Sequence, residues 1–331
     1  MSQPYFTPKR VSSDFLLFKE FLKHLFADFS QSKHFQELNL SFLQFVSSQP
    51  EVFKAYQTFS QYIGKSSAFF DELTSDIDEE GKSQNIISLI RIFSQFFYHH
   101  YFRVTVKGAE HIPQKKGALF IANHSGLIPF DAGMITCALF NHTKAARQTR
   151  YLVDDFVFNL PGGAAFMRLV GGLPASIQNA KHLLSHNEQV LLFPEGVKGL
   201  SKDYQHRYQL QSFGRGGFVK LALEHNAPIV PVAVIGAEES SPLLEKNESF
   251  AHYLGLPYLP ATSTFPWLGP LGLIPLPTKW TIVFGKPIRP KTPSTADLER
   301  ADYFSAEAEK MKQLLSQMLE KELEQRDTIW E

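Results

Sequence analysis

The pattern of apolar and polar positions divides the chain near residue 84. Residues 14–29 repeat apolar side chains at helical spacing, and weaker repeats of the same kind run through residues 35–46, 52–63 and 69–73. None of these segments alternates apolar and polar residues as a strand does. The pattern therefore predicts an all-helical, Phe-rich N-terminal appendage over residues 1–84, which ends in a polar linker.

Short apolar runs typical of buried strands follow from residue 103 onwards. Helical stretches such as residues 180–186 and 217–224 separate these runs. Buried strands that alternate with helices predict an α/β domain with a mostly parallel central sheet flanked by helices, and we place it at residues 85–290. The five apolar runs are residues 103–107, 118–122, 190–193, 229–235 and 280–284.

Residues 291–331 carry a helical pattern with one apolar face. The residues of this face are Met311, Leu314, Leu315, Met318 and Leu319. Because such a face is normally buried against another element, we expect a C-terminal docking helix that packs on the α/β domain.

Two segments are long enough to be considered as membrane spans. Residues 249–278 carry no fixed charge, but six prolines interrupt them, and one membrane helix cannot hold so many. Residues 86–102 hold one fixed charge, Arg91, and several polar side chains, so they predict a buried or interfacial helix. Because the start of the chain also lacks the pattern of a signal peptide, we expect a cytoplasmic protein.

Composition narrows the class of protein. The chain has 331 residues, 44% of them hydrophobic and 30 of them Phe, which is enough for a large core and excludes a disordered chain. Its 33 basic residues balance 33 acidic ones, which argues against a nucleic-acid-binding protein. The single cysteine, Cys137, excludes an intrachain disulfide and a multi-thiolate zinc site and fits a reducing compartment.

Candidate chemistry begins directly after the apolar run at residues 118–122. His124 stands near the carboxyl end of this predicted strand, where open α/β sheets bind their ligands. Asp131 stands at the start of a predicted helix, and a carboxylate there can hydrogen-bond the imidazole and stabilise its protonated form. The alternative is that His124 caps this helix and Asp131 is its N-terminal acidic residue. Ser125 lacks the Gly-x-Ser-x-Gly turn of a serine nucleophile.

Two further segments carry polar residues after an apolar run. In Phe193-Pro194-Glu195-Gly196, Glu195 is placed to hydrogen-bond a polyol hydroxyl or to brace a catalytic histidine, and Lys198 to meet an anion. The alternative is a plain turn with solvated charges. In Phe213-Gly-Arg215-Gly-Gly217, Arg215 can bind a phosphate, although an ordinary turn before a helix is the simpler interpretation.

Taken in order, these segments resemble the signature of the glycerolipid (lysophospholipid) acyltransferase superfamily, which includes 1-acylglycerol-3-phosphate acyltransferases. The four blocks are Asn123-His124 with Asp131, Val170-Gly-Gly-Leu-Pro174, Phe193-Pro-Glu-Gly196 and Ile229-Val-Pro231-Val. The resemblance implies an O-acyltransferase that moves a fatty acyl group from acyl-coenzyme A or acyl carrier protein to the hydroxyl of a lysophospholipid or an acylglycerol.

The resemblance also implies roles for single residues. His124 would be the general base, Asp131 would orient it, and Glu195 with Gly196 would help to bind the acceptor. The resemblance implies no metal ion and no bound cofactor. The residues expected to contact substrate are Asn123, Ser125, Gly126, Phe193, Pro194, Glu195, Gly196, Lys198 and Arg215.

Two departures from the family pattern bear on the acceptor. Six residues separate His124 from Asp131 instead of the usual four, which is closer to the monoacylglycerol acyltransferase branch. Lys198 stands after Phe-Pro-Glu-Gly where phosphate-binding members carry an arginine, and a lysine binds phosphate only as a point charge. These departures disfavour a phosphomonoester acceptor unless Arg207 or Arg215 compensates.

Two other functions stay open at the level of sequence. Water could replace the alcohol, which would make a thioesterase or lipid esterase, or the chain could be a non-catalytic lipid-binding protein. The intact His, Asp and Glu argue against the second. For a lipid enzyme with no net charge, we expect peripheral binding to the cytoplasmic face of a membrane through apolar insertion or a local basic patch. For the Phe-rich helices of residues 14–73, a structural bundle or a partner-docking surface is at least as consistent with the pattern as a membrane anchor, and acyl carrier protein is a candidate partner of the chain.

Overall fold

The computed structural model describes residues 75–78, 81–126, 128–143, 149–160, 162–247, 251, 258–266, 272–295, 297 and 300–330. The helices predicted for residues 14–73 lie outside these ranges. The chain divides into two compact units, residues 1–93 with 157–172 and residues 94–156 with 173–331.

In the first unit, polar side chains begin helix α5 (Gln84–Phe96). Asp76 Oδ2 accepts hydrogen bonds from the backbone N–H groups of Gln84 and Asn85, at 2.7 and 3.0 Å. Ser83 Oγ accepts a third, from the N–H of Ile86, at 3.1 Å. These bonds satisfy donors that the first turn of a helix leaves free. The helix continues as the π-helical turn η1 (Phe97–Tyr101), so the helix predicted for residues 86–102 is confirmed.

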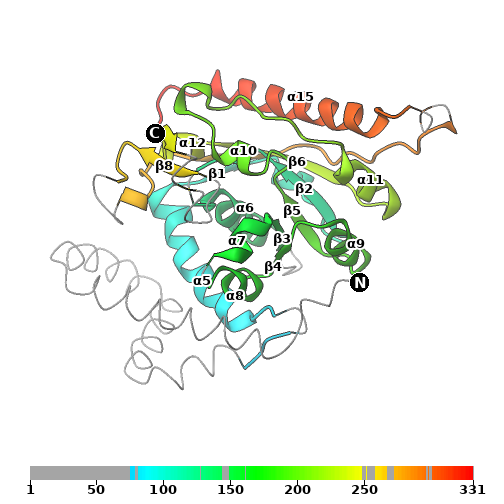
Figure 1. Cartoon of the computed structure of the whole chain (residues 1–331), viewed down its shortest axis with the longest axis horizontal. Helices are drawn as coiled ribbons and strands as arrows, with labels where there is room; N and C mark the ends of the chain where they lie inside the picture. Colours follow the sequence, from blue (N-terminus) through cyan, green and yellow to red (C-terminus); the bar gives the residue numbers. More distant parts are fainter. Residues whose placement is uncertain are drawn as a thin grey trace. The chain divides into compact units, whose positions relative to one another are not determined.

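Seven strands form the central sheet, in the order β1-β9-β6-β2-β5-β3-β4 (Figure 1). The strands from β6 through β2 and β5 to β3 run parallel, whereas β9 pairs antiparallel with β6 and parallel with β1. The predicted α/β fold with a mostly parallel sheet is confirmed. The strands are β1 (Thr105–Lys107), β2 (Ala118–Ala122), β3 (Thr149–Val153), β4 (Gly172–Pro174), β5 (Gln189–Leu192), β6 (Ile229–Ile235) and β9 (Thr281–Phe284).

All five apolar runs form strands, and β2 and β6 have the predicted bounds. The runs do not predict β3, because Arg150 interrupts it, although this side chain is almost fully buried. They also miss β4 and a small antiparallel pair, β7 (Leu243–Asn247) with β8 (Leu259–Thr262). Strand β8 lies inside the proline-rich stretch at residues 249–278 and includes Pro260.

Helices cover both faces of the sheet. Leu119 and Ile121 of β2 point into one core cluster, which α9 (Ile177–Ser185), α11 (Gly217–Glu224) and α15 (Tyr303–Leu323) complete. Phe120 points into the other cluster, together with α6 (Phe130–His142) and η1. Because successive strand residues face opposite sides, both faces of a fully buried strand need such a cover. In Figure 1, α15 runs along the sheet on the opposite side from α6.

Shorter helices connect these elements. They are η2 (Ala109–His111), α7 (Asp155–Asn159), α8 (Gly163–Leu169), α10 (Val197–Leu200), η3 (Tyr204–His206) and α12 (Ala237–Ser240). None of the helices in the described ranges has both the length and the apolar character that crossing a membrane requires.

The apolar face of α15 generates a test of the packing. Leu315 is fully buried, so we expect Leu315→Ala to lower the free energy of unfolding by about 2–5 kcal/mol, because it leaves a cavity under the helix. Gln317→Ala, on the exposed side of the same helix, should change it by less than about 0.5 kcal/mol. Urea unfolding followed by circular dichroism measures both variants; equal effects would contradict the packing of α15.

Candidate active site

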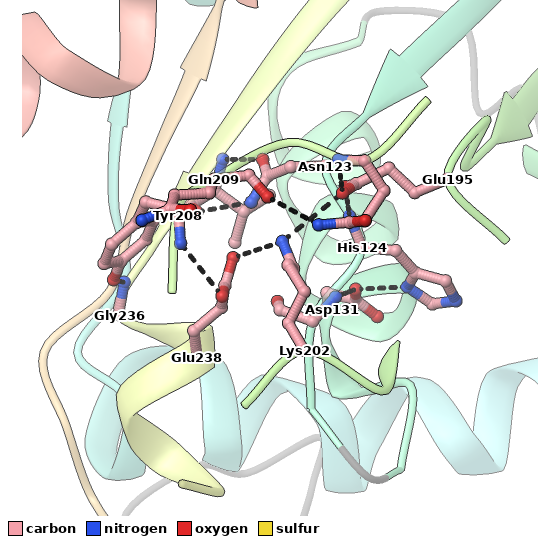
Figure 2. Close-up of polar contacts among 12 residues, drawn as sticks. Asn123, His124, Asp131, Glu195, Lys202, Tyr208, Gln209, Gly236 and Glu238 are labelled. Carbon is pink, nitrogen blue, oxygen red and sulfur yellow. Dashed lines mark hydrogen bonds and ion pairs between the residues drawn. The ribbon is translucent and has the colours of Figure 1, made fainter. Parts of the chain in front are cut away.

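Loops that follow three neighbouring strands meet at one edge of the central sheet. Strands β5, β2 and β6 are adjacent and parallel, so their carboxyl ends lie at the same edge. His124 follows β2, Glu195 follows β5, and Glu238 lies in α12 just after β6. The sheet order thereby makes neighbours of residues that are far apart in the sequence, as Figure 2 shows.

His124 and Asp131 form a hydrogen-bonded pair. His124 Nδ1 lies 2.7 Å from Oδ2 of Asp131, which is fully buried at the start of α6. The Asp131 carboxylate also accepts hydrogen bonds from the backbone N–H groups of Ser125, at 2.9 Å, and Ala132, at 2.8 Å. A carboxylate facing Nδ1 keeps the proton on that nitrogen and leaves Nε2 as the basic one. The alternative in which His124 caps the helix is wrong, because the cap position is Pro129.

One aromatic ring and one close backbone contact restrain His124. The ring of Phe193 stacks on it, with centroids 4.0 Å apart and 19° between the planes. Gly199 packs so closely that a Cβ atom there would lie 2.9 Å from the Cβ of His124. Among the described residues no group hydrogen-bonds Nε2 of His124, so this nitrogen can exchange a proton with a bound molecule.

Both carboxylate oxygens of Glu195 are engaged inside the protein. Oε1 accepts a hydrogen bond from the backbone N–H of His124 at 2.9 Å, and Oε2 accepts one from the backbone N–H of Gln211 at 2.7 Å. Glu195 is buried, with 4% of its surface exposed. Of the two roles considered from the sequence, this geometry fits the brace of a catalytic histidine better than a contact with an acceptor hydroxyl.

Asn123, expected to contact substrate, joins two strands instead. Its side-chain Nδ2 donates to the carbonyl oxygen of Val234 on β6 at 3.0 Å, and its Oδ1 accepts from the N–H of the same residue at 2.8 Å. The side chain is fully buried. It therefore fixes the end of β2 against β6. Because His124 is the next residue, this also fixes the position of its backbone.

A small pocket opens beside the histidine loop. The residues that line it are Ser125, Gly126, Gly199, Leu200, Lys202, Tyr204, Arg207, Glu238, Ser241 and Leu243. Ser125 Oγ is buried and has no hydrogen-bond partner among the described residues. The backbone N–H of Gly126 likewise donates to none of them. A buried polar group such as Ser125 Oγ is normally paired, and the N–H of the half-buried Gly126 lies beside it without a partner in the described part of the chain, so both groups are suited to a ligand atom in the pocket.

The other residues expected to bind substrate occupy different surroundings. Pro194 and Gly196 shape a turn in which the Gly196 N–H donates to the Phe193 carbonyl oxygen at 3.0 Å, and Gly196 has φ 56°. Lys198 and Arg215 are exposed and do not line the pocket. Arg207, which lines it, is also exposed, and its guanidinium lies 4.5 Å above the ring of Tyr204.

Lys202 and Glu238 are site residues that the sequence analysis does not identify. Lys202 Nζ lies 2.8 Å from Oε1 of Glu238, and both side chains are buried. Burial raises the pKa of Glu238 above its usual value, against the opposing effect of the lysine charge. The sequence shows no sign of this pair, because Lys202 stands in a run of polar residues and Glu238 beside a second acidic residue. Such patterns are typical of a solvated surface. Within the described ranges, no three His, Cys, Asp or Glu side chains are grouped to hold a metal ion.

Several known proteins are similar to this chain. Uncharacterised proteins of Mycobacterium tuberculosis and Mycobacterium leprae are 45% and 44% identical over 233 residues, which is 70% and 69% of this chain. The chain spans 64% of the length of each of these relatives. A human protein named "DGAT1/2-independent enzyme synthesizing storage lipids" is 30% identical over 128 residues, or 38% of either chain.

A solved structure and a family model add to these similarities. The chain is similar to the crystal structure of the 1-acyl-sn-glycerophosphate (LPA) acyltransferase PlsC from Thermotoga maritima, with a TM-score of 0.49 and 18% identity over 80% of this chain and 93% of that one. The sequence model of the Acyltransferase family matches residues 103–235, the range that contains all four signature blocks. Residues 103–235 therefore match the Acyltransferase family, and the resemblance of this chain to the glycerolipid acyltransferase superfamily is confirmed.

Proposed function

We propose that this protein is an O-acyltransferase that moves a fatty acyl group from an acyl thioester to the hydroxyl of a lipid alcohol. The observation that carries the proposal is the His124–Asp131 pair, whose basic nitrogen is unpaired among the described residues and whose loop lines a polar pocket. The match of residues 103–235 to the Acyltransferase family model supports acyl transfer as the reaction.

In the proposed mechanism, Nε2 of His124 takes the proton of the acceptor hydroxyl while the oxygen attacks the thioester carbonyl. The buried Asp131 carboxylate stabilises the imidazolium that forms. The tetrahedral intermediate then collapses, its C–S bond breaks, and the leaving thiolate takes the proton back from Nε2. The products are the new ester and free coenzyme A or carrier-protein thiol.

The developing oxyanion needs hydrogen-bond donors. Ser125 Oγ and the N–H of Gly126 follow His124 directly, line the pocket, and have no partner among the described residues. Gly126 has φ 87°, in the left-handed region that favours glycine, so the turn that exposes this N–H depends on the residue type. We assign these two donors to the oxyanion.

For the acceptor, we propose a neutral acylglycerol. The buried cation that lines the pocket, Lys202, already faces two carboxylates, Glu195 and Glu238. A phosphomonoester would need additional positive charge there, and Arg207 is exposed at the rim. The six-residue spacing between His124 and Asp131 and the name of the human relative support the same choice.

A lipid acceptor requires contact with a lipid surface, and two exposed apolar side chains flank the pocket. Ile128 lies two positions after the pocket residue Gly126 and is 42% exposed, and Leu244 follows the pocket residue Leu243 and is 61% exposed. Since the chain has no net charge, we propose that apolar insertion of such residues holds it peripherally on a membrane.

Replacing the base tests the mechanism. We expect His124→Ala to lower acceptor-dependent thiol release from a long-chain acyl-coenzyme A by at least about 100-fold, because the general base is lost. Thermal unfolding should show that the variant is folded. His142→Ala, at the exposed end of α6, is the matched control and should keep full activity. Full activity of His124→Ala would overturn the assignment, and thiol release that does not depend on an acceptor would indicate a thioesterase.

A competition between acceptors tests the proposed substrate class. With a labelled acyl donor, we expect kcat/KM for a monoacylglycerol to exceed that for a lysophosphatidate of the same chain length by at least about tenfold, or about 1.4 kcal/mol. The reason is that a phosphate would enter a pocket whose buried lysine is already neutralised. Mass spectrometry of the lipid products measures both rates in one mixture. Equal rates, or a preference for lysophosphatidate, would contradict the neutral acceptor.

A further inference from the structure

Lys202 is buried, which is unusual for a lysine side chain. Its side chain is 3% exposed and lies between two buried carboxylates, as Figure 2 shows. The Nζ atom lies 2.8 Å from Oε1 of Glu238 and 3.4 Å from Oε2 of Glu195. A buried ammonium group is unfavourable unless it is paired, so the lysine and the two carboxylates depend on one another.

The Glu195 carboxylate links this ion cluster to the catalytic loop. Its Oε1 holds the backbone N–H of His124, at 2.9 Å, while Lys202 faces Oε2. A buried carboxylate keeps its charge, and therefore its strength as a hydrogen-bond acceptor, only when a cation or several donors lie nearby. Gly199 leaves no room for rearrangement, because a Cβ there would lie 2.8 Å from the Cβ of Glu195.

The Glu238 side of the cluster is anchored in turn. Glu238 Oε2 accepts a hydrogen bond from the backbone N–H of Tyr208 at 3.0 Å, and the Tyr208 hydroxyl accepts one from the N–H of Gly236 at 2.8 Å. Next to Glu238, Glu239 pairs with Arg326 at 2.7 Å. On the β6 side, Lys202 is thus held by groups that do not contact the His124–Asp131 pair.

We propose that Lys202 is a positioning residue: it holds the Glu195 carboxylate in the orientation that fixes the backbone of His124 for catalysis. In this role Lys202 contacts neither the acyl group nor the acceptor hydroxyl. The catalytic consequence rests on the proposed acyl transfer, whereas the structural link from Lys202 through Glu195 to His124 does not.

Replacing the lysine has a defined consequence. In Lys202→Met the Glu195 carboxylate loses the cation that faces its Oε2, so it is held less firmly and its hydrogen bond to the His124 N–H weakens. The other groups around this carboxylate are the N–H groups of His124 and Gln211, with Glu238 beyond the lysine. The backbone of His124 should then be held less firmly, so kcat should fall.

The test compares Lys202→Met, Lys202→Arg and, as a control, Lys220→Met on the exposed face of α11. We expect Lys202→Met to lower kcat at least tenfold while KM for the acyl donor stays within twofold. Lys202→Arg, which keeps the charge, should retain most of kcat, and Lys220→Met should match the wild type. Wild-type kcat in Lys202→Met, or an equal loss in Lys202→Arg, would overturn the proposal.

A second measurement does not depend on activity. Hydrogen exchange of the His124 backbone amide reports its bond to Glu195, and we expect exchange at least tenfold faster in Lys202→Met than in the wild type. Unchanged exchange would overturn the positioning role even if kcat falls. If wild-type protein transfers no acyl group to any lipid alcohol but the exchange effect is present, the proposed function fails and the link from Lys202 to His124 stands.

Discussion

The Glu195 carboxylate is the interaction on which the arrangement of this site depends. It follows β5, yet its two oxygens bind backbone N–H groups of two other segments, at His124 after β2 and at Gln211. Hydrogen bonds to a charged acceptor are stronger than neutral ones, and here they act on the main chain. The position of the base is thereby set through its backbone, before any side-chain contact orients the ring.

A second layer of contacts fixes the imidazole. Asp131 holds Nδ1, and the ring of Phe193 lies parallel to the imidazole of His124. Asn123, directly before the histidine, is tied to β6 by two hydrogen bonds to Val234. Three parallel neighbouring strands therefore restrain the same short loop. Such preorganisation means that little reorganisation is required during reaction, which is the condition under which electrostatic stabilisation is effective.

The local parts of this site could be predicted from the sequence, and the non-local parts could not. The pair of His124 and Asp131 spans one turn after an apolar strand, so pattern and spacing suffice to suggest it. Contact between Lys202, which follows β5, and Glu238, which follows β6, exists because both strands pair with β2, and the order of strands in a sheet is not visible in a single sequence. The internal role of Asn123 depends on register in the same way.

The fold shows the same division. Continuous apolar runs predicted β2 and β6 to the residue, whereas β3 was missed because burial of Arg150 in a strand contradicts the usual meaning of a charged residue. Proline at position 260 marks a break in most strands, but β8 belongs to a two-stranded sheet and has a single neighbour, which leaves one edge without ladder bonds to satisfy.

The pairing of Arg326 with Glu239 has a consequence for the order in which the protein is made. The guanidinium also donates to the carbonyl oxygens of Lys279 and Ile329, at 2.9 and 3.2 Å, so the acidic pair after β6 receives its last partner from a segment synthesised about 90 residues later. Consider a growing chain from which the residues up to Glu239 have already left the ribosome. This chain contains His124, Lys202 and both glutamates of the ion cluster, but it still lacks Arg326 and the apolar face of α15. The ion pair of Glu239 therefore forms only once residues up to 329 have left the ribosome, and until then the part of the sheet that α15 covers is exposed, although α9 and α11 already lie on the same face.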